Sequence, residues 1–158
     1  MRYINFEEDL AIVPDDFFMI EALKEAKQAL DLDEVPIGAV VVHKGRIIGR
    51  GHNLTETLND VTAHAEMQAL TAAANYVGGK YLKDCTLYVT IEPCVMCAGA
   101  SYWTQISRIV FAAHDQKRGF SQIKQRIVHP RTEVASGILA ESAAQLMRDF
   151  FIAKRDKS

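Results

Sequence analysis

The sequence predicts an α/β protein, a three-layer α/β/α sandwich built on a mixed sheet of about five strands. Runs rich in β-branched residues alternate along the chain with amphipathic segments of helical length. Two residues separate the first two strand-like runs, which predicts a hairpin, whereas one helix-length segment separates a later pair, which predicts parallel strands. The 158 residues contain no repeat or linker and are expected to form one domain with helices on both faces of the sheet.

The N-terminal residues divide into an extension and the start of the domain. Residues 1–14 are expected to be an extension, and residues 15–158 the single domain. Asp15 or Asp16 is expected to cap a helix that runs to about Leu30, because a short acidic side chain accepts hydrogen bonds from the first backbone N–H groups of a helix.

A hairpin and a second helix are expected next. Residues 37–43 and 46–51 form the two predicted strands around the turn at Lys44-Gly45. A polar loop then leads into a helix over about residues 63–76, which Gly78 and its glycine neighbour would close.

The second half of the chain supplies the predicted parallel pair and the last helix. Residues 86–91 form a strand, residues 94–103 a helix, and residues 108–113 a strand that is expected to lie parallel to the first. A short fifth strand is expected over residues 132–135. A final amphipathic helix is expected over about residues 139–154.

Composition indicates a soluble cytoplasmic protein with no membrane association. Apolar residues make up 49% and charged residues 24%, as in ordinary globular proteins. The first nine residues do not have the pattern of a secretory signal, and no run approaches the roughly 18 apolar residues that a membrane span needs. Three cysteines, two of them three residues apart, favour reduced thiols and a metal over a disulfide framework.

The charge is unevenly distributed despite a net value of −2. Residues 116–132 hold five cations and no acid. Such a segment can neutralise phosphates, although charge alone favours the simpler interpretation of a solvated basic face.

Two short motifs place potential metal ligands at helix starts. His64 and Glu66 open the second predicted helix, and Cys94 and Cys97 open the third. Cysteines three residues apart in a first helical turn share one face, and the helix N-terminus stabilises thiolates there. One imidazole and two thiolates suit tetrahedral Zn²⁺.

The fourth ligand decides whether such a site is structural or catalytic. Cys85 begins the strand that leads towards Cys94, which puts about 20 Å between them. His52 and His114 remain possible but are isolated in the sequence. An open position for water, and hence a catalytic site, is favoured. Glu66 lies about 200° around the helix from His64, so it is expected to reach the adjoining pocket instead of the metal.

The order His-Ala-Glu followed by Pro-Cys-x-x-Cys resembles the signature of the zinc-dependent nucleobase deaminases, which have the cytidine deaminase-like fold. The resemblance covers about residues 16–155. Within this superfamily the chain is most similar to the TadA-like tRNA adenosine deaminases, through four stretches and an Asp-Phe-Phe sequence in the last helix. The stretches are 35–40, 59–66, 87–100 and 137–140.

The resemblance implies a hydrolytic deaminase with one zinc ion per chain, held by His64, Cys94 and Cys97. Glu66 would take a proton from the zinc-bound water and deliver it to the ring nitrogen beside the attacked carbon. The implied reaction converts the wobble adenosine of a tRNA anticodon to inosine and releases ammonia. The alternatives are a deaminase of a free base such as guanine or cytosine, and a silent zinc-stabilised subunit, which the presence of Glu66 disfavours.

The resemblance also implies contacts and partners. Asn53, the backbone N–H of Ala65 and the carbonyl at Glu92-Pro93 would hold the base, and Asp115 would lie near the ribose or serve only as a turn residue. Lys117, Arg118 and Arg155 are candidates for contacts with the phosphates of a tRNA anticodon stem-loop. The family further implies a homodimer. Two departures concern Val61, where the family has proline, and the segment after Asp115, which is shorter than usual.

Overall fold

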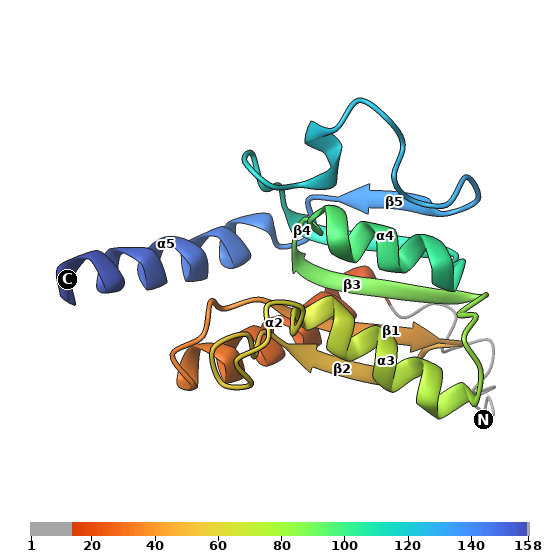
Figure 1. The fold of residues 1–158 in the computed structure, drawn as a ribbon, viewed down its shortest axis with the longest axis horizontal. Coiled ribbons are helices and arrows are strands. Elements are labelled where there is room, and N and C mark those ends of the chain that lie inside the picture. The colour runs from red at the N-terminus through yellow and green to blue at the C-terminus, as the bar shows by residue number, and fades with distance from the viewer. Residues whose placement is uncertain (1–13, 158) are drawn as a thin grey trace, which may run out of the picture.

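The computed structural model describes residues 14–157, so the expected extension lies, apart from Pro14, outside the described residues (Figure 1). In chain order the elements are α2 (Asp15–Asp31), β1 (Gly38–His43), β2 (Arg46–His52), α3 (Ala65–Val77), β3 (Cys85–Ile91), α4 (Val95–Thr104), β4 (Arg108–Ala113), the short 3₁₀ helix η1 (Phe120–Gln122), β5 (Glu133–Ser136) and α5 (Ala140–Lys157). Each predicted helix and strand is present, and no end differs from its predicted position by more than three residues.

The sheet is mixed and has five strands in the order β2-β1-β3-β4-β5. β1 runs antiparallel to β2 and β3, whereas β4 runs parallel to β3 and β5. The predicted hairpin and the predicted parallel pair are therefore both confirmed. Lys44 and Gly45 connect the hairpin with φ values of 48° and 73°, the left-handed pair that a two-residue turn between twisted strands requires.

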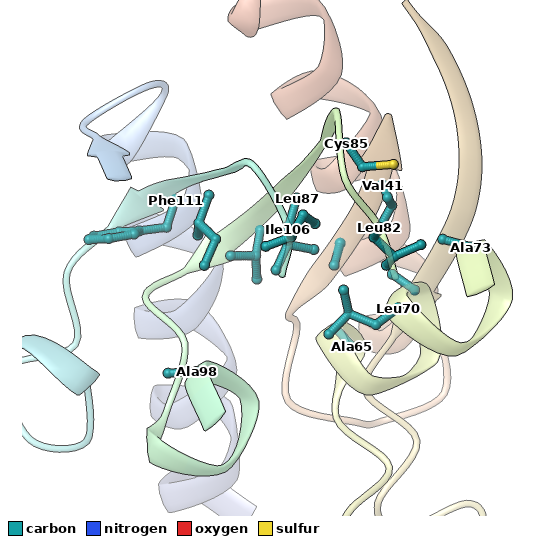
Figure 2. Packing of buried hydrophobic residues seen from close by; sticks show 14 of the residues in the cluster. Val41, Ala65, Leu70, Ala73, Leu82, Cys85, Leu87, Ala98, Ile106 and Phe111 are labelled. Atoms are coloured by element: carbon teal, nitrogen blue, oxygen red, sulfur yellow. The ribbon is translucent and has the colours of Figure 1, made fainter. Parts of the chain in front are cut away.

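Helices cover both faces of the sheet, as predicted (Figure 1). Alternate strand residues face opposite layers, so Val41, Leu87 and Phe111 pack with α3 and α4. Their neighbours Val40 and Tyr88 pack with α2 and α5 on the other face. Figure 2 shows the first of these clusters, in which Ala65, Leu70 and Ala73 of α3 approach the side chains of the sheet. No helix within residues 14–157 is long and apolar enough to cross a membrane.

Helix α3 packs unusually close to β2 because two glycines face it. A Cβ atom on Gly51 would lie 2.4 Å from the carbonyl oxygen of Ala65, and one on Gly49 would lie 2.3 Å from that of Ala69. Both distances are too short for any side chain at those positions. The backbone of the strand thus supports the helix directly.

The expectation that Asp15 or Asp16 caps α2 is wrong. The N-cap position belongs to Pro14, and no side chain caps the helix. Asp15 is instead the first helical residue, and its carboxylate accepts two hydrogen bonds from the Arg108 guanidinium, at 2.7 and 2.9 Å, and one from the Tyr88 hydroxyl at 2.7 Å. The acid therefore joins α2 to the middle of the sheet.

Replacing Asp15 with asparagine is expected to destabilise the protein by about 1–2 kcal/mol at neutral pH. The hydrogen bond from Arg108 lowers the pKa of Asp15 below its usual value. Because the folded-state pKa is lowered, this stabilisation is present above the unfolded pKa, about 3.9, and is lost as the pH falls through the folded pKa. Urea unfolding at pH 7 and near pH 3 measures the effect.

Asp16→Asn is the matched control, because that side chain is exposed and lies one residue away. An equal loss of stability in both variants at pH 7, or a difference that persists undiminished at pH 3, would contradict the assigned role of the Asp15–Arg108 pair.

Candidate metal centre and active site

His64 stands immediately before helix α3. Its backbone is extended, with φ −73° and ψ 157°, and it occupies the N-cap position. The helix therefore begins at Ala65, two residues later than predicted. Glu66 lies in the first turn and is almost fully buried, with 4% of its surface exposed.

Cys94 and Cys97 occupy the equivalent end of α4. Cys94 is the N-cap, also extended, with φ −73° and ψ 175°, and Cys97 lies in the first turn. The Nδ1 atom of His64 is 3.6 Å from the Sγ atom of Cys94 and 3.5 Å from that of Cys97. Within the described residues, these three form the one group of histidine, cysteine or acidic side chains whose atoms converge closely enough to hold a metal ion.

The spacing of the three atoms fits a tetrahedral zinc ion. Bonds of about 2.3 Å to sulfur and about 2.0–2.1 Å to nitrogen hold a sulfur and a nitrogen about 3.6 Å apart around such an ion. The two measured nitrogen–sulfur distances agree with that value.

The other candidates for a fourth protein ligand are engaged elsewhere. Cys85 lies beside His43, with 3.8 Å between sulfur and Nδ1. His52 contacts Glu25 at 3.2 Å, and His114 contacts Glu92 at 3.1 Å. The convergent group thus offers three potential protein ligands within the described residues.

A hydrogen bond between Cys94 and Cys97 shifts the pKa values of the two thiols in opposite directions. Donation from Cys97 lowers the pKa of Cys94 to about 4, and the same bond raises the pKa of Cys97. The hydrogen bond to Cys94 also raises the pKa of His64. Cys94 is at a helix N-terminus, where the helix dipole also favours the thiolate form.

Glu66 contacts the buried Cys97 and is itself buried. Burial raises the pKa of its carboxyl group to about 7, and the carboxyl contacts the Cys97 thiol. A carboxyl group in such surroundings exchanges a proton near neutral pH, as general acid–base chemistry requires.

Asn53 follows β2 directly and begins the loop that leads to His64. Its side chain is 7% exposed. The Nδ2 atom donates to the carbonyl of Val35 at 3.4 Å, and Oδ1 accepts from the N–H of Thr55 at 3.2 Å. Each end of the amide is thereby oriented and keeps one further hydrogen-bonding position. Ala65, the first residue of α3, has a backbone N–H with no partner inside the helix.

Glu92 and Pro93 connect β3 to Cys94 and hold the loop after β4. The Glu92 carboxylate accepts from the N–H groups of Asp115 at 3.2 Å and Ser121 at 2.8 Å, besides the ring of His114. The Pro93 carbonyl accepts from the N–H of Phe120 at 3.0 Å. The structural role of the Glu92 side chain was missed by the sequence reasoning, which considered only the carbonyl.

A sequence signal for that role exists in Gly119. A Cβ atom there would lie 2.3 Å from the Glu92 carboxylate. A larger residue at this position would displace the Glu92 carboxylate from the place where it accepts the loop N–H groups.

The remaining predicted contacts fall on the molecular surface. The Asp115 carboxylate accepts from the N–H groups of Lys117 at 3.0 Å and Arg118 at 2.9 Å, so it shapes its own turn. Both cationic side chains are exposed in the loop after β4. Arg155 lies near the end of α5, which extends beyond the sheet (Figure 1).

Comparison with known proteins identifies relatives of the whole described chain. The sequence matches the family of MafB19-like deaminases over residues 14–155. The tRNA-specific adenosine deaminase of Streptococcus pyogenes serotype M18 is 43% identical over 146 residues, which cover 89% of this chain and 92% of that protein. The enzyme of the same name from Bacillus subtilis is 43% identical over 148 residues, covering 90% and 92%.

Solved structures give a matching result. A structure from studies of A-to-I editing by tRNA:A34 deaminases at the wobble position of transfer RNA superposes with a TM-score of 0.78 and 42% identity, covering 82% of this chain and 98% of that one. A guanine deaminase from Bacillus subtilis gives 0.62 and 38%, covering 65% and 66%. The fold and these identities show that the chain belongs to the MafB19-like deaminase family and groups with the tRNA-specific adenosine deaminases.

Proposed function

We propose that the protein is a zinc-dependent hydrolytic deaminase that converts the wobble adenosine of a tRNA anticodon to inosine and releases ammonia. The observation that carries the proposal is the convergence of His64, Cys94 and Cys97 beside the buried Glu66. Identity of 43% to tRNA-specific adenosine deaminases over about nine tenths of the chain supports the choice of substrate.

One zinc ion per chain would be held by His64, Cys94 and Cys97. When bound, zinc lowers the pKa of its water to about 7, so that hydroxide is available at neutral pH. The distances from His64 Nδ1 to the Sγ atoms of Cys97 and Cys94, 3.5 and 3.6 Å, support the binding of zinc by these three residues.

Glu66 would move the protons of the reaction. Its carboxylate accepts a proton from the attacking water and delivers it to N1 of the adenine ring, beside C6. The water oxygen forms a bond to C6, the bond from C6 to the amino nitrogen breaks, and a further proton transfer by Glu66 lets that nitrogen leave as ammonia. The burial of Glu66 keeps bulk water from the proton in transit.

The walls of the pocket would hold the base. The free hydrogen-bonding positions of the Asn53 amide, the N–H of Ala65 and the carbonyl groups at Glu92-Pro93 are the proposed anchors. Asp115 is proposed to lie near the ribose while it shapes its turn. The base must leave its stack in the anticodon loop to reach this depth.

The exposed cations would hold the RNA backbone. Lys117, Arg118 and Arg155 are proposed to contact phosphates of the anticodon stem-loop. Such binding releases counterions from the RNA, and it weakens as the salt concentration rises because that release becomes less favourable. We place the enzyme in the cytoplasm, which supplies this substrate. None of the three cysteines, all of them in the described part of the chain, forms a disulfide, as that compartment favours.

One experiment separates the tRNA assignment from the alternative. Similarity to a guanine deaminase leaves a free base as the second candidate substrate. The zinc-loaded protein is incubated with an anticodon stem-loop that carries the wobble adenosine, and separately with free guanine, cytosine and adenosine. Inosine in the stem-loop is expected. Ammonia from a free base, with an unchanged stem-loop, would overturn the tRNA assignment.

Glu66→Gln is expected to keep one zinc per chain and lose turnover by a factor of about 10²–10⁴, because the amide has the same shape but cannot carry the proton. Metal analysis and initial rates measure the two quantities. Glu141→Gln, at an exposed residue in α5, is the control. Loss of zinc from the Glu66 variant would show that this side chain supports the metal and not the chemistry.

The protein is also proposed to form a homodimer. Large apolar side chains are exposed on α3, on α4 and in the loop that leads into α3, and we propose that a second copy of the chain covers them. They are Leu58, Val61, Tyr76, Val95, Tyr102 and Trp103. The Trp103 side chain is 76% exposed, so it does not pack into the core of its own chain.

Trp103→Lys is expected to shift the protein from dimer towards monomer, because the interface would have to bury a charge. Analytical ultracentrifugation over a range of concentrations measures the change. Ile152→Lys is the control, since that exposed apolar residue lies on α5. A wild-type protein that sediments as a monomer would contradict the dimer, and an equal shift in both variants would contradict the chosen interface.

A further inference from the structure

Glu34 is a fully buried acid in the turn between α2 and β1, with no exposed surface. One carboxylate oxygen accepts from the N–H of Glu56 at 2.8 Å. The other is contacted by the same N–H at 3.2 Å, and by the N–H and the hydroxyl of Thr57, both at 3.4 Å. All of these donors belong to the loop that connects β2 to α3.

That loop joins Asn53, a proposed contact of the base, to His64, a proposed metal ligand. It starts at Asn53, whose N–H donates to the carbonyl of Ile37 at 3.1 Å, and ends at His64. Near its ends the N–H of Leu54 donates to the carbonyl of Ala63 at 3.0 Å. The loop thus wraps around the Glu34 carboxylate, between the Asn53 amide and the start of α3.

The loop supplies the hydrogen-bond donors of the Glu34 carboxylate. Among residues 14–157 no cation forms an ion pair with it. A buried carboxyl group without hydrogen bonds is costly, so the donors of the loop stabilise Glu34 in this place. A glutamine at this position would turn an NH₂ group towards amide hydrogens, and it would lose at least one of the contacts.

We propose that Glu34 is a positioning residue for the substrate base. By fixing the backbone of Glu56 and Thr57, it holds the loop in the shape that presents the Asn53 amide to the pocket. It touches neither the proposed metal ligands nor Glu66. The inference rests on the proposed function for its substrate, whereas the loop contact itself stands on the structure.

The test compares Glu34→Gln with Glu25→Gln in the zinc-loaded protein. Glu25 is also buried, with 5% exposure, but its carboxylate contacts His52 and Arg50 and no part of the loop. Glu34→Gln is expected to raise KM for the anticodon stem-loop about tenfold, equal to about 1.4 kcal/mol of binding, with kcat within about twofold and zinc at one per chain. Glu25→Gln is expected to leave KM near its wild-type value.

A second readout does not depend on activity. Amide hydrogen exchange at Glu56 and Thr57 is expected to be at least tenfold faster in Glu34→Gln than in Glu25→Gln, because opening of the loop exposes those amides. If Glu34→Gln does not fold, Thr57→Val removes the hydroxyl contact alone and is expected to raise KM about twofold.

The outcomes separate the two proposals. An unchanged KM in Glu34→Gln, a fall confined to kcat, or equal exchange in the two variants would overturn the role of Glu34. A wild-type protein that leaves the stem-loop unchanged would overturn the proposed function, and the exchange at Glu56 and Thr57 would still decide whether Glu34 holds the loop.

Discussion

The direct contact of α3 with the backbone of β2 sets the position of the whole site. Gly49 and Gly51 leave no room for a Cβ atom between the strand and the helix, so α3 can only lie at one distance from the sheet. His64 is the residue before the one whose carbonyl meets Gly51. A side chain at either glycine would push α3 away from the sheet. The His64 imidazole would move with the helix, away from the sulfur atoms of Cys94 and Cys97.

The second half of the site meets the first because α4 connects two parallel strands. α4 packs on the same face of the sheet as α3, and the two helices begin at the same end of the strands. His64 and Cys94 are both N-caps with extended backbones. Two helix N-termini therefore face one point, where their dipoles favour thiolates and any anion that the chemistry produces.

Sequence reasoning recovered what depends on local pattern. Strand periodicity, the Lys44-Gly45 turn and the length of the crossover predicted the sheet, and the three-residue spacing of the cysteines predicted their shared face. The prediction was wrong where a side chain forms its hydrogen bonds with a residue that is distant in the sequence. Asp15 fits a cap by its position, but Arg108, 93 residues away, offers a charged bidentate partner that a backbone N–H does not match.

The buried acids show the same limit, and each of them holds a loop beside the candidate site. Glu34 and Glu92 accept backbone N–H groups from segments 22 to 29 residues away, so no local pattern assigns their partners. Each acid replaces the regular hydrogen bonding that its loop lacks. In the proposed reaction, a base taken from the anticodon loop would have to align with Glu66. Loops that already have a fixed shape avoid the entropy loss of ordering at that moment, and more of the binding energy remains for the reaction.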